Sequence, residues 1–476
     1  MQHSPLWTID EVVPATGGTL SRPVNAAVYG VSIDSRSVAK GDLFVAIKGG
    51  KQDGHAFVQA ALQAGAAAAL VSHATGEMIS TGAVIETGED PLRGLEAMAH
   101  AARARSKAAI TAITGSVGKT STKEMLRLAL SASGVTHASA SSFNNHWGVP
   151  LSLSRLHRNS AYGVFEIGMN HAGEIAPLVQ IVQPHVAIIT NVAASHLGHF
   201  SSLDEIAKAK SEIFSGLDTN GTAILNRDSP QFGFLKEEAA NHGIRGIVTF
   251  GKHPDADVRP RAMALRPDMS CISADIRGVA MDYKLGLPGE HMALNSLAVL
   301  AAVSVIGADL ARAAMALAGA QPAKGRGVIQ QLHIGAGTLL LLDESYNANP
   351  ASVVAALALL KQQTPGRAGR RIAVLGDMLE LGDFAPQLHA DIATQLQNHS
   401  VDLLFAAGPL MAHLWNETPL ANRGAYAASS AELSDILLQN IRAGDVVMVK
   451  GSLGSKMAPL ADSLRSKYEP VKRNSD

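Results

Sequence analysis

One segment of this 476-residue sequence has the residue types and spacing that bind a phosphate chain. After the apolar run Ala109–Thr114 it reads Gly-Ser-Val-Gly-Lys-Thr-Ser, and the amphipathic stretch Lys123–Leu130 follows. The two glycines allow backbone N–H groups to curl around phosphates at the positive end of the following helix. Lys119 would neutralise the β- and γ-phosphates, and the Thr120 hydroxyl would ligate Mg²⁺. The nucleotide-binding residues expected in this loop are Gly115, Ser116, Val117, Gly118, Lys119, Thr120 and Ser121.

The loop departs from the general nucleotide-binding pattern at one position. That pattern has a further glycine five residues before Gly118, where this chain has Ile113. The segment is therefore the shorter form, Thr-Gly-x-x-Gly-Lys-Thr. The alternative is an ordinary glycine-rich turn, which the order of strand, loop and helix disfavours.

Candidate metal ligands follow two further apolar runs. Glu166 ends the run Gly163–Ile167, and a carboxylate at a strand end can hold Mg²⁺ directly or through water. A solvent-facing glutamate is the alternative, and the apolar neighbours disfavour it. His196 and His199 come shortly after the run Val186–Asn191. From position alone these histidines are either metal ligands or structural residues of a loop.

The elements that must position these residues alternate along the chain. Short apolar runs predict strands, and helical stretches separate them, which is typical of α/β folds with doubly wound parallel sheets. Beyond the runs already named, strands are expected at Gly221–Leu225, Thr338–Asp343, Ile372–Gly376, Leu403–Ala406 and Val446–Lys450. We predict three domains: a smaller α/β domain at 1–88, a central P-loop domain with a mostly parallel sheet at 89–320, and a Rossmann-like domain at 321–476. The Gly/Pro-rich stretch Gly319–Gly327 would link the last two.

Composition excludes several classes of protein. Lys and Arg number 40 and Asp and Glu 41, so the chain lacks the basic surplus of a nucleic-acid binder. With 47% hydrophobic and 17% charged residues the chain is not intrinsically disordered. Cys271 is the only cysteine, which excludes an intramolecular disulfide. No signal peptide or membrane span is recognisable, so we expect a cytoplasmic protein without membrane insertion, and a monomer.

Beyond the phosphate loop, motifs in consistent order resemble the Mur ligase family over nearly the whole chain. They are TGSVGKTST, SFNNHWGVPLSL, EIGMNHAGEI, NVAASHLGHF, AKAKSEIF, PGEHMALNSLAVLAA, DESYNANP and LGDMLELG. Three of them, NNHWGVP, EIGMNHAGE and DESYNANP, are similar to the member that adds a D-Ala-D-Ala dipeptide rather than one of the first three amino acids. The resemblance implies that ATP phosphorylates the terminal carboxylate of UDP-N-acetylmuramoyl-tripeptide. The amine of D-Ala-D-Ala would then attack the acyl phosphate, giving UDP-N-acetylmuramoyl-pentapeptide, ADP and phosphate for peptidoglycan synthesis.

The resemblance also implies roles for residues of the catalytic centre. Thr120 and Glu166 would hold one Mg²⁺, and His196 a second. Asn295 would contact the adenine, and Arg326 would reach the nucleotide from the third domain. In the segment that begins Asp343-Glu344 the family usually has two aspartates, so either acid is left as the ribose ligand.

A carbamylated lysine is expected beside the metals. Ser202–Glu205 is a capping box that starts a helix, and helical spacing puts Lys210 on one face with Ile206, Ile213 and Phe214. Lys208 would share the wet face with Asp204, Ser211 and Glu212. Mg²⁺ would repel an inward ammonium, whereas a carbamate formed with CO₂ offers anionic oxygens, and the resemblance indicates the same lysine. An unmodified Lys210 paired with phosphate remains the alternative.

Substrate-binding residues are expected in all three domains. Ser32, Asp34, Ser35 and Arg36 lie in the segment that resembles the UDP-binding part of the family, and an ordinary turn is the equal alternative. The resemblance implies that residues around the tripeptide bind the substrate: Asn144, Asn145, Asn170, His171, Tyr346, Asn347 and Asn349. Lys450 and Ser452, at a Gly/Ser turn after a strand, form a plausible nest for the dipeptide carboxylate, with a simple strand–helix connection as the alternative.

Three alternative functions compete with this one. A GTPase-like switch needs an Asn-Lys-x-Asp motif, which Asn226-Arg-Asp-Ser does not fit. Another Mur-type ligase, such as a folylpolyglutamate synthase-like or cyanophycin synthetase-like enzyme, stays open to an assay. A non-catalytic homologue is disfavoured by the presence of Lys119, Glu166 and Lys210 together.

Overall fold

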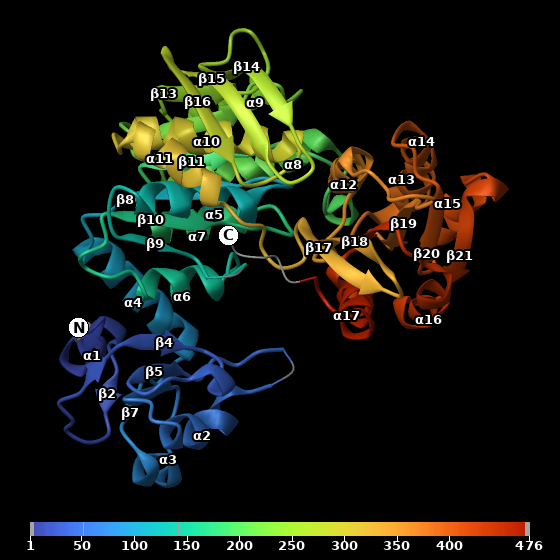
Figure 1. Cartoon of the computed structure of the whole chain (residues 1–476). Helices are drawn as coiled ribbons and strands as arrows, with labels where there is room; N and C mark the ends of the chain where they lie inside the picture. The colour runs from blue at the N-terminus through green and yellow to red at the C-terminus, as the bar shows by residue number, and fades with distance from the viewer. Residues whose placement is uncertain (1–3, 51, 141, 472–476) are drawn as a thin grey trace.

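The computed structural model describes residues 4–50, 52–140 and 142–471, and these form three α/β parts in chain order (Figure 1). The expected fold class is confirmed, and the strands expected from apolar runs are present with ends shifted by one or two residues. We retain the proposed domain boundaries, since they fall between Glu86 and Pro91 and between Gly319 and Val328. Among the described helices, none is long and apolar enough to cross a membrane.

The N-terminal part contains a small five-stranded sheet in the order β2-β7-β6-β5-β4. Its strands are β2 (Thr19–Leu20), β4 (Gly30–Ser32), β5 (Asp42–Val45), β6 (Ala68–Val71) and β7 (Val84–Glu86), and β1 (Trp7–Thr8) pairs separately with β3 (Ala27–Val28). The helices are α1 (Ile9–Thr16), α2 (Val58–Gln63) and α3 (Gly76–Thr81), and α4 (Pro91–Arg105) begins just after the proposed boundary. Helix α4 is shared, because Leu95 and Met98 belong to the N-terminal core while Ala99 belongs to the central one.

The central part contains a nine-stranded sheet in the order β16-β15-β14-β13-β12-β11-β8-β10-β9. Its strands are β8 (Ala109–Thr114), β9 (Thr136–Ala138), β10 (Tyr162–Glu166), β11 (Val186–Ile189), β12 (Thr222–Asn226), β13 (Gly246–Phe250), β14 (Val258–Leu265), β15 (Ser270–Ile276) and β16 (Val279–Leu285). Its helices are α5 (Lys119–Ser131), α6 (Gly148–Ser154), α7 (Ile175–Val182), α8 (Leu203–Ser211), α9 (Phe232–Asn241), α10 (Glu290–Ile306) and α11 (Leu310–Ala316). Pairing is parallel from β9 to β14, and β14, β15 and β16 form an antiparallel extension that the apolar runs did not predict. The reason is that these last strands alternate buried and exposed residues, so they contain no continuous apolar run.

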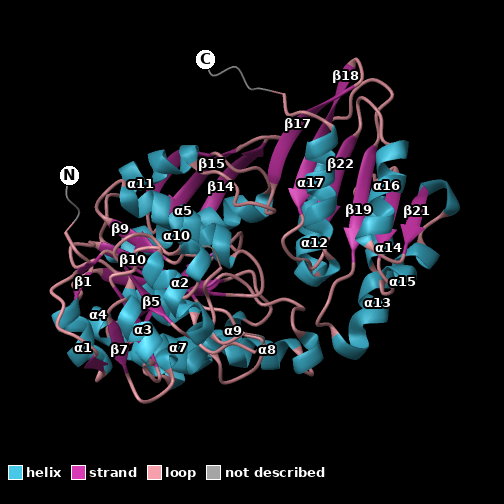
Figure 2. Cartoon of the chain, turned by 90° about the horizontal axis from the view of Figure 1, so that it is seen from below, coloured by secondary structure: helices cyan, strands magenta, loops and turns pink. Residues whose placement is uncertain are grey.

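The C-terminal part contains a six-stranded sheet in the order β17-β18-β22-β19-β20-β21, and only the β17–β18 pair is antiparallel. The strands are β17 (Val328–Ile334), β18 (Gly337–Glu344), β19 (Arg371–Gly376), β20 (Leu403–Ala407), β21 (Arg423–Ala427) and β22 (Val446–Lys450). The helices are α12 (Pro350–Gln362), α13 (Ala385–Ala390), α14 (Ile392–Asn398), α15 (Met411–Glu417), α16 (Ser430–Asn440) and α17 (Met457–Lys467). Figure 2 shows these strands side by side with helices on both faces, as the two separate apolar clusters of this part require.

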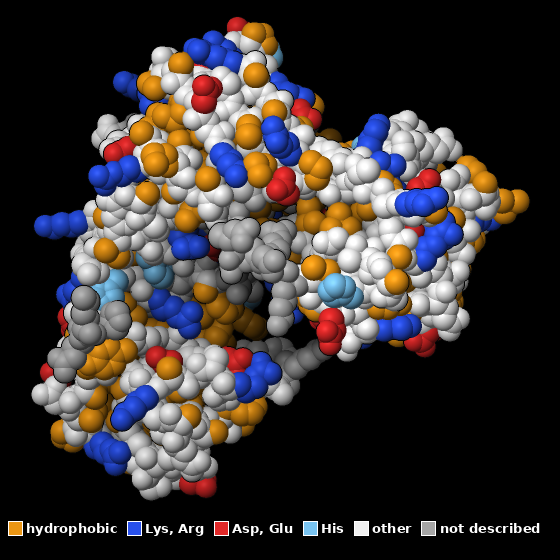
Figure 3. All heavy atoms as spheres, in the orientation of Figure 1, with side chains coloured by type: hydrophobic (Ala, Val, Ile, Leu, Met, Phe, Trp, Pro, Cys, Tyr) orange, Lys and Arg blue, Asp and Glu red, His pale blue; other side chains and the backbone are white. Residues whose placement is uncertain are grey.

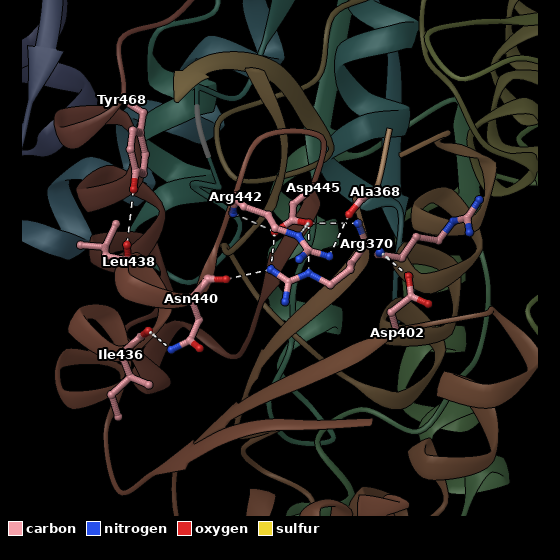
Figure 4. A network of polar contacts seen from close by, with 10 residues as sticks. Ala368, Arg370, Asp402, Ile436, Leu438, Asn440, Arg442, Asp445 and Tyr468 are labelled. Carbon is pink, nitrogen blue, oxygen red and sulfur yellow. Dashed lines mark hydrogen bonds and ion pairs between the residues drawn. The ribbon is translucent and has the colours of Figure 1, made fainter. Parts of the chain in front are cut away.

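A buried carboxylate fixes the amino ends of two neighbouring strands in this sheet (Figure 4). Asp445, just before β22, accepts hydrogen bonds from the backbone N–H of Arg370 at 2.9 Å and from Arg370 Nη2 at 2.7 Å. It also accepts one from the backbone N–H of Arg442 at 2.9 Å. The network sets how β22 lies against β19, and Lys450 lies at the opposite end of β22.

We expect Asp445→Ala to destabilise the C-terminal part by about 3 kcal/mol, because it leaves the Arg370 charge and backbone donors without their buried acceptor. Urea unfolding measures the change. Asp435→Ala, which removes an exposed carboxylate from α16, should change the stability by less than ~0.5 kcal/mol and is the matched control. Equal stability of both variants would contradict the anchoring role of Asp445.

Candidate active site

The carboxyl ends of three parallel strands meet at one edge of the central sheet. Strand β8 lies between β10 and β11, and the register pairs Glu166 with Ile113 and Ile189 with Thr114. The loop that follows β8 therefore begins beside Glu166 on one side and beside the segment after β11 on the other. Loops at such an edge are the usual ligand site of an open α/β sheet.

The loop after β8 has the tight backbone that its glycines predict. Gly115 has φ +145°, and a Cβ there would lie 1.9 Å from Thr190 Oγ1. Gly118 has φ +87°, and a Cβ there would lie 2.7 Å from Asn295 Nδ2. Both positions thus require glycine, and Asn295 packs behind the loop. The N–H groups of Ser116 and Val117 donate to the backbone oxygen and Oδ1 of Asn191, so the donors left for phosphate are those at the start of α5.

A buried hydroxyl and carboxylate lie together beside the loop. Thr120 Oγ1 donates to Glu166 Oε2 at 2.9 Å, and Asn144 Nδ2 donates to Glu166 Oε1 at 2.7 Å. Thr120 and Glu166 are 4% and 1% exposed. Mg²⁺ is bound by one or two oxygen ligands from protein, together with substrate phosphates and water. The pair fits that ion, and the described residues contain no cluster of three His, Cys, Asp or Glu that would suit a metal held by protein alone.

Two lysines from different helices lie near the phosphate loop. Lys119 Nζ donates to the backbone oxygen of Gly115 at 2.6 Å. Its withdrawal from water lowers its pKa, although the charge of Glu166 opposes the shift. Lys210 on α8 is 2% exposed, and burial together with the charge of Lys119 holds its pKa well below the usual range. Among the described residues no carboxylate forms an ion pair with Lys210, so burial shifts its equilibrium toward the neutral amine.

Helix α8 begins where the capping pattern predicted. Ser202 Oγ accepts a hydrogen bond from the N–H of Glu205, and Lys208 is exposed whereas Lys210 is buried. The expectation that Ser211 lies on the wet face with Lys208 is wrong, since Ser211 is 2% exposed and its hydroxyl donates to the backbone of Lys208. Glu212, which was also expected on the wet face, is half-buried, because its carboxylate accepts hydrogen bonds from N–H groups around the start of α7.

The C-terminal part contributes a second group of charges. Glu344 and Lys450 end the neighbouring strands β18 and β22 in register, and Lys450 Nζ lies 3.5 Å from Glu344 Oε2. The ammonium also donates to the backbone oxygen of Asn347 at 2.9 Å. Burial raises the pKa of Glu344, which the charge of Lys450 opposes. Arg326, from the linker, lies with its guanidinium carbon 3.9 Å from the centre of the Tyr346 ring.

One cavity of about 380 Å³ brings these groups together. The phosphate loop, Asn144, Glu166 and Asn170 line it from the central part. Arg326, Glu344, Tyr346, Asn347, Asn349, Lys450 and Ser452 line it from the linker and the C-terminal part. The face drawn in Figure 3 is hollowed between the N-terminal and C-terminal parts. A phosphate site on one wall and a buried ammonium on the other indicate a site for two anionic substrates.

Comparison with known proteins agrees with this arrangement. Family models match three segments: the Mur ligase family catalytic domain at 27–106, the Mur ligase middle domain at 113–303, and the Mur ligase glutamate ligase domain at 331–453. The chain belongs to the Mur ligase family.

Individual relatives match over almost their full length. The UDP-N-acetylmuramoyl-tripeptide–D-alanyl-D-alanine ligase of Rickettsia prowazekii is 32% identical, with 96% of this chain and 99% of the relative covered. The enzyme of the same name from Bacillus subtilis is 30% identical, with 96% and 98% covered. A crystal structure of MurF from Acinetobacter baumannii is 30% identical, has a TM-score of 0.83, and covers 97% of this chain and 99% of its own.

Several residues expected in the site of this Mur ligase do not line the cavity. Asp343 accepts hydrogen bonds from the Ser345 hydroxyl and from Arg465, so of the two neighbouring acids only Glu344 reaches the cavity. Asn145 caps α6 through its Oδ1, which accepts from the N–H of Gly148. Gly115 and Asn295 form the back of the phosphate loop, and neither they nor Lys210 are among the lining residues. His171, Ser32, Asp34, Ser35 and Arg36 are also absent from the lining.

Two expected ligands have their side chains engaged by the protein itself. Asn349 lines the cavity, but its Oδ1 accepts from the N–H of Ser352 and caps α12. Ser452 is 4% exposed, and its hydroxyl donates to the backbone oxygen of Ala348 and accepts from the N–H of Leu379. In both cases the side chain shapes the wall of the cavity.

The cavity is also lined by residues that were not predicted from the sequence. His291 and Met292 lie beside the linker, and burial together with Lys450 lowers the pKa of His291 to about 4, so this imidazole is neutral. Leu379, Glu380 and Leu453 come from loops of the C-terminal part. His291 and Met292 occur in HMALN, and Leu379 and Glu380 in LGDMLELG, two segments of the motifs that resemble the family; Leu453 lies outside them.

We expect Lys119→Ala to reduce ATP turnover to below ~1% of the wild-type rate, because the phosphates lose a positive charge at short range. The fold should be retained, since Lys119 lines a cavity and lies outside the apolar cores. Phosphate release and circular dichroism measure the two effects. Lys236→Ala, on the exposed face of α9, is the control, and near-normal turnover by the Lys119 variant would rule out the phosphate-loop assignment.

Proposed function

We propose that this Mur ligase joins D-Ala-D-Ala to UDP-N-acetylmuramoyl-tripeptide in an ATP-dependent reaction, giving UDP-N-acetylmuramoyl-pentapeptide, ADP and phosphate. The observation that carries the proposal is the cavity, in which the phosphate loop and the Thr120–Glu166 pair face Lys450 and Glu344 of the C-terminal part. Relatives that match 96% of the chain have this activity in their names.

The reaction requires two displacements in one closed site. A carboxylate oxygen of the tripeptide attacks the γ-phosphorus of ATP, and ADP leaves with the electrons of the broken bond. The dipeptide amine then attacks the acyl carbon, phosphate leaves, and the amine proton passes to solvent. Lys119 and Arg326 are the cations placed to offset the repulsion between the two anions. Closure of the C-terminal part over the central part would exclude the water that hydrolyses acyl phosphates.

We assign metal binding to residues at the carboxyl edge of the central sheet. Thr120 and Glu166 would hold one Mg²⁺, and His196 with a carbamylated Lys210 a second. Bound Mg²⁺ supplies positive charge to the transferring phosphoryl group. The lowered pKa of Lys210 supports carbamylation, because only a neutral amine attacks CO₂. In that step the Nζ–carbon bond forms, a C=O bond electron pair moves onto oxygen, and the nitrogen loses a proton.

The remaining substrate contacts would come from all three parts of the molecule. Lys450, at the end of β22, would bind the dipeptide carboxylate. Ser452 would hold the neighbouring loop in place through the N–H of Leu379. Asn144, Asn170, His171, Tyr346 and Asn347 would flank the tripeptide. Ser32, Asp34, Ser35 and Arg36 would contact the UDP group, where Arg36 is exposed and its ion pair lowers the pKa of Asp34 to about 2. Because ATP and UDP-linked sugars are cytoplasmic metabolites, we propose a cytoplasmic enzyme, and we propose that it acts as a monomer.

Phosphate release under four conditions tests this function. Release from ATP should require both UDP-N-acetylmuramoyl-tripeptide and D-Ala-D-Ala, and neither alone should suffice. Another Mur-type ligase would respond to a different amine, and a nucleotide switch would hydrolyse its nucleotide without either substrate. Mass spectrometry of the product from a mixture of tripeptides ending in meso-diaminopimelate and in L-lysine then identifies the third residue.

We expect Lys210→Ala to lose most of its ligation activity and to recover part of it when a short carboxylic acid is added, because the acid replaces the oxygens of the carbamate. Wild-type activity should fall in CO₂-depleted buffer and return with bicarbonate. As the pH falls through the lowered pKa of Lys210, its amine becomes protonated and activity should decline. Lys208→Ala removes an exposed lysine from the same helix and should stay active. Full activity of Lys210→Ala, or loss only in the Lys208 variant, would overturn the assignment.

A further inference from the structure

A loop of the C-terminal part reaches across the cavity to the metal side of the central part. It follows β19 and includes Glu380, whose Oε2 lies 2.6 Å from His196 Nδ1. The backbone oxygen of Glu380 also accepts a hydrogen bond from the N–H of Gly198 at 2.9 Å. The two loops approach so closely that a Cβ on Gly198 would lie 3.2 Å from the backbone nitrogen of Gly382. Side-chain and backbone contacts therefore join the loops at the same point.

Both residues of the pair have backbone conformations that other contacts must maintain. His196 has φ +58° and Glu380 has φ +63°, a region that residues other than glycine rarely adopt. In this conformation the two side chains point toward each other across the boundary between the parts. A non-glycine residue keeps such a backbone only where its surroundings impose it, and such sites are enriched at functional positions.

The other end of the Glu380 loop is anchored to the segment that follows β22. The N–H of Leu379 donates to Ser452 Oγ at 2.9 Å, and the N–H of Ser452 donates to the backbone oxygen of Asp377 at 3.0 Å. A continuous series of hydrogen bonds thus runs from the segment after Lys450, through the Glu380 loop, to His196.

We propose that Glu380 is a positioning residue for His196. Its carboxylate accepts a hydrogen bond from Nδ1–H, which fixes the ring orientation and leaves Nε2 unprotonated as the nitrogen available to a ligand in the cavity. Histidine ligands of metals are commonly oriented by a carboxylate in this way. The inference rests on the proposed function, which places His196 beside Mg²⁺. It implies that this ligand is correctly oriented only while the C-terminal part lies against the central part.

Two variants of Glu380 and one control test the proposal. Glu380→Ala removes the acceptor, whereas Glu380→Gln retains an oxygen that can accept from Nδ1–H and loses only the charge. Asp383→Ala removes an exposed carboxylate three residues along the same loop and is the matched control. Circular dichroism shows whether each variant is folded, and Glu380→Gln carries the test if Glu380→Ala is not.

The first measurement is the ¹⁵N spectrum of histidine-labelled protein without ligands. The wild type should show His196 protonated at Nδ1, as should Glu380→Gln and Asp383→Ala, while Glu380→Ala should shift toward Nε2–H. The second is the Mg²⁺ concentration that gives half-maximal ligation. It should rise about 10- to 100-fold in Glu380→Ala, less in Glu380→Gln and not in Asp383→Ala, with the KM for the UDP substrate unchanged throughout.

Unchanged ¹⁵N signals in Glu380→Ala, or an unchanged Mg²⁺ requirement, would each overturn the positioning role. An equal rise in the Asp383 variant would also overturn it, because the effect would then be one of loop charge alone. Should the wild type fail to ligate these substrates, the proposed function fails, while the ¹⁵N spectra still decide whether Glu380 sets the protonation of His196.

Discussion

A carboxylate buried at the end of a strand is the constraint on which the rest of the site depends. Glu166 is 1% exposed, and its two oxygens accept from Thr120 and Asn144, both neutral donors. A buried negative charge is costly unless a cation lies nearby. Lys119 is one such cation, and a metal ion bound by Thr120 and Glu166 would be a second. The phosphate loop must pass close to this carboxylate to bring Thr120 to it. Glycine at positions 115 and 118 allows the positive φ of this loop and its close passage beside Thr190 and Asn295.

The local features of this design were predictable from sequence, because they depend on neighbours in the chain. The phosphate loop, the strand that ends at Glu166, and the inward direction of Lys210 follow from spacing, caps and apolar runs. The antiparallel strands β14, β15 and β16 were missed because alternating exposure hides them from a search for apolar runs.

For several candidate residues, contacts with residues distant in the sequence determine whether the side chain is available to a ligand. Asp343 is engaged by Arg465, which lies far along the chain on α17, so Glu344 alone reaches the cavity. Ser452 and Asn349 have the right chemistry for ligands, yet each satisfies backbone groups of its own part. Glu380 lies in the motif LGDMLELG, but the motif does not reveal its contact with His196, which is in a different part of the molecule. Whether such a side chain can bind a ligand depends on the hydrogen-bond partners that the fold places beside it.

The distribution of charge between the parts explains why the site is assembled from two of them. The central part brings Lys119 close to Glu166, and the charge of Lys119 lowers the pKa of Lys210 on α8. The C-terminal part brings Lys450 with Glu344, a pair that is almost neutral overall. Neither wall alone offers enough positive charge for ATP and a second anion, whereas Arg326, on the linker between them, adds a cation to both. Positive charge is therefore concentrated in the cavity only when the two walls face each other, so the geometry that binds the substrates is the one that excludes water from them.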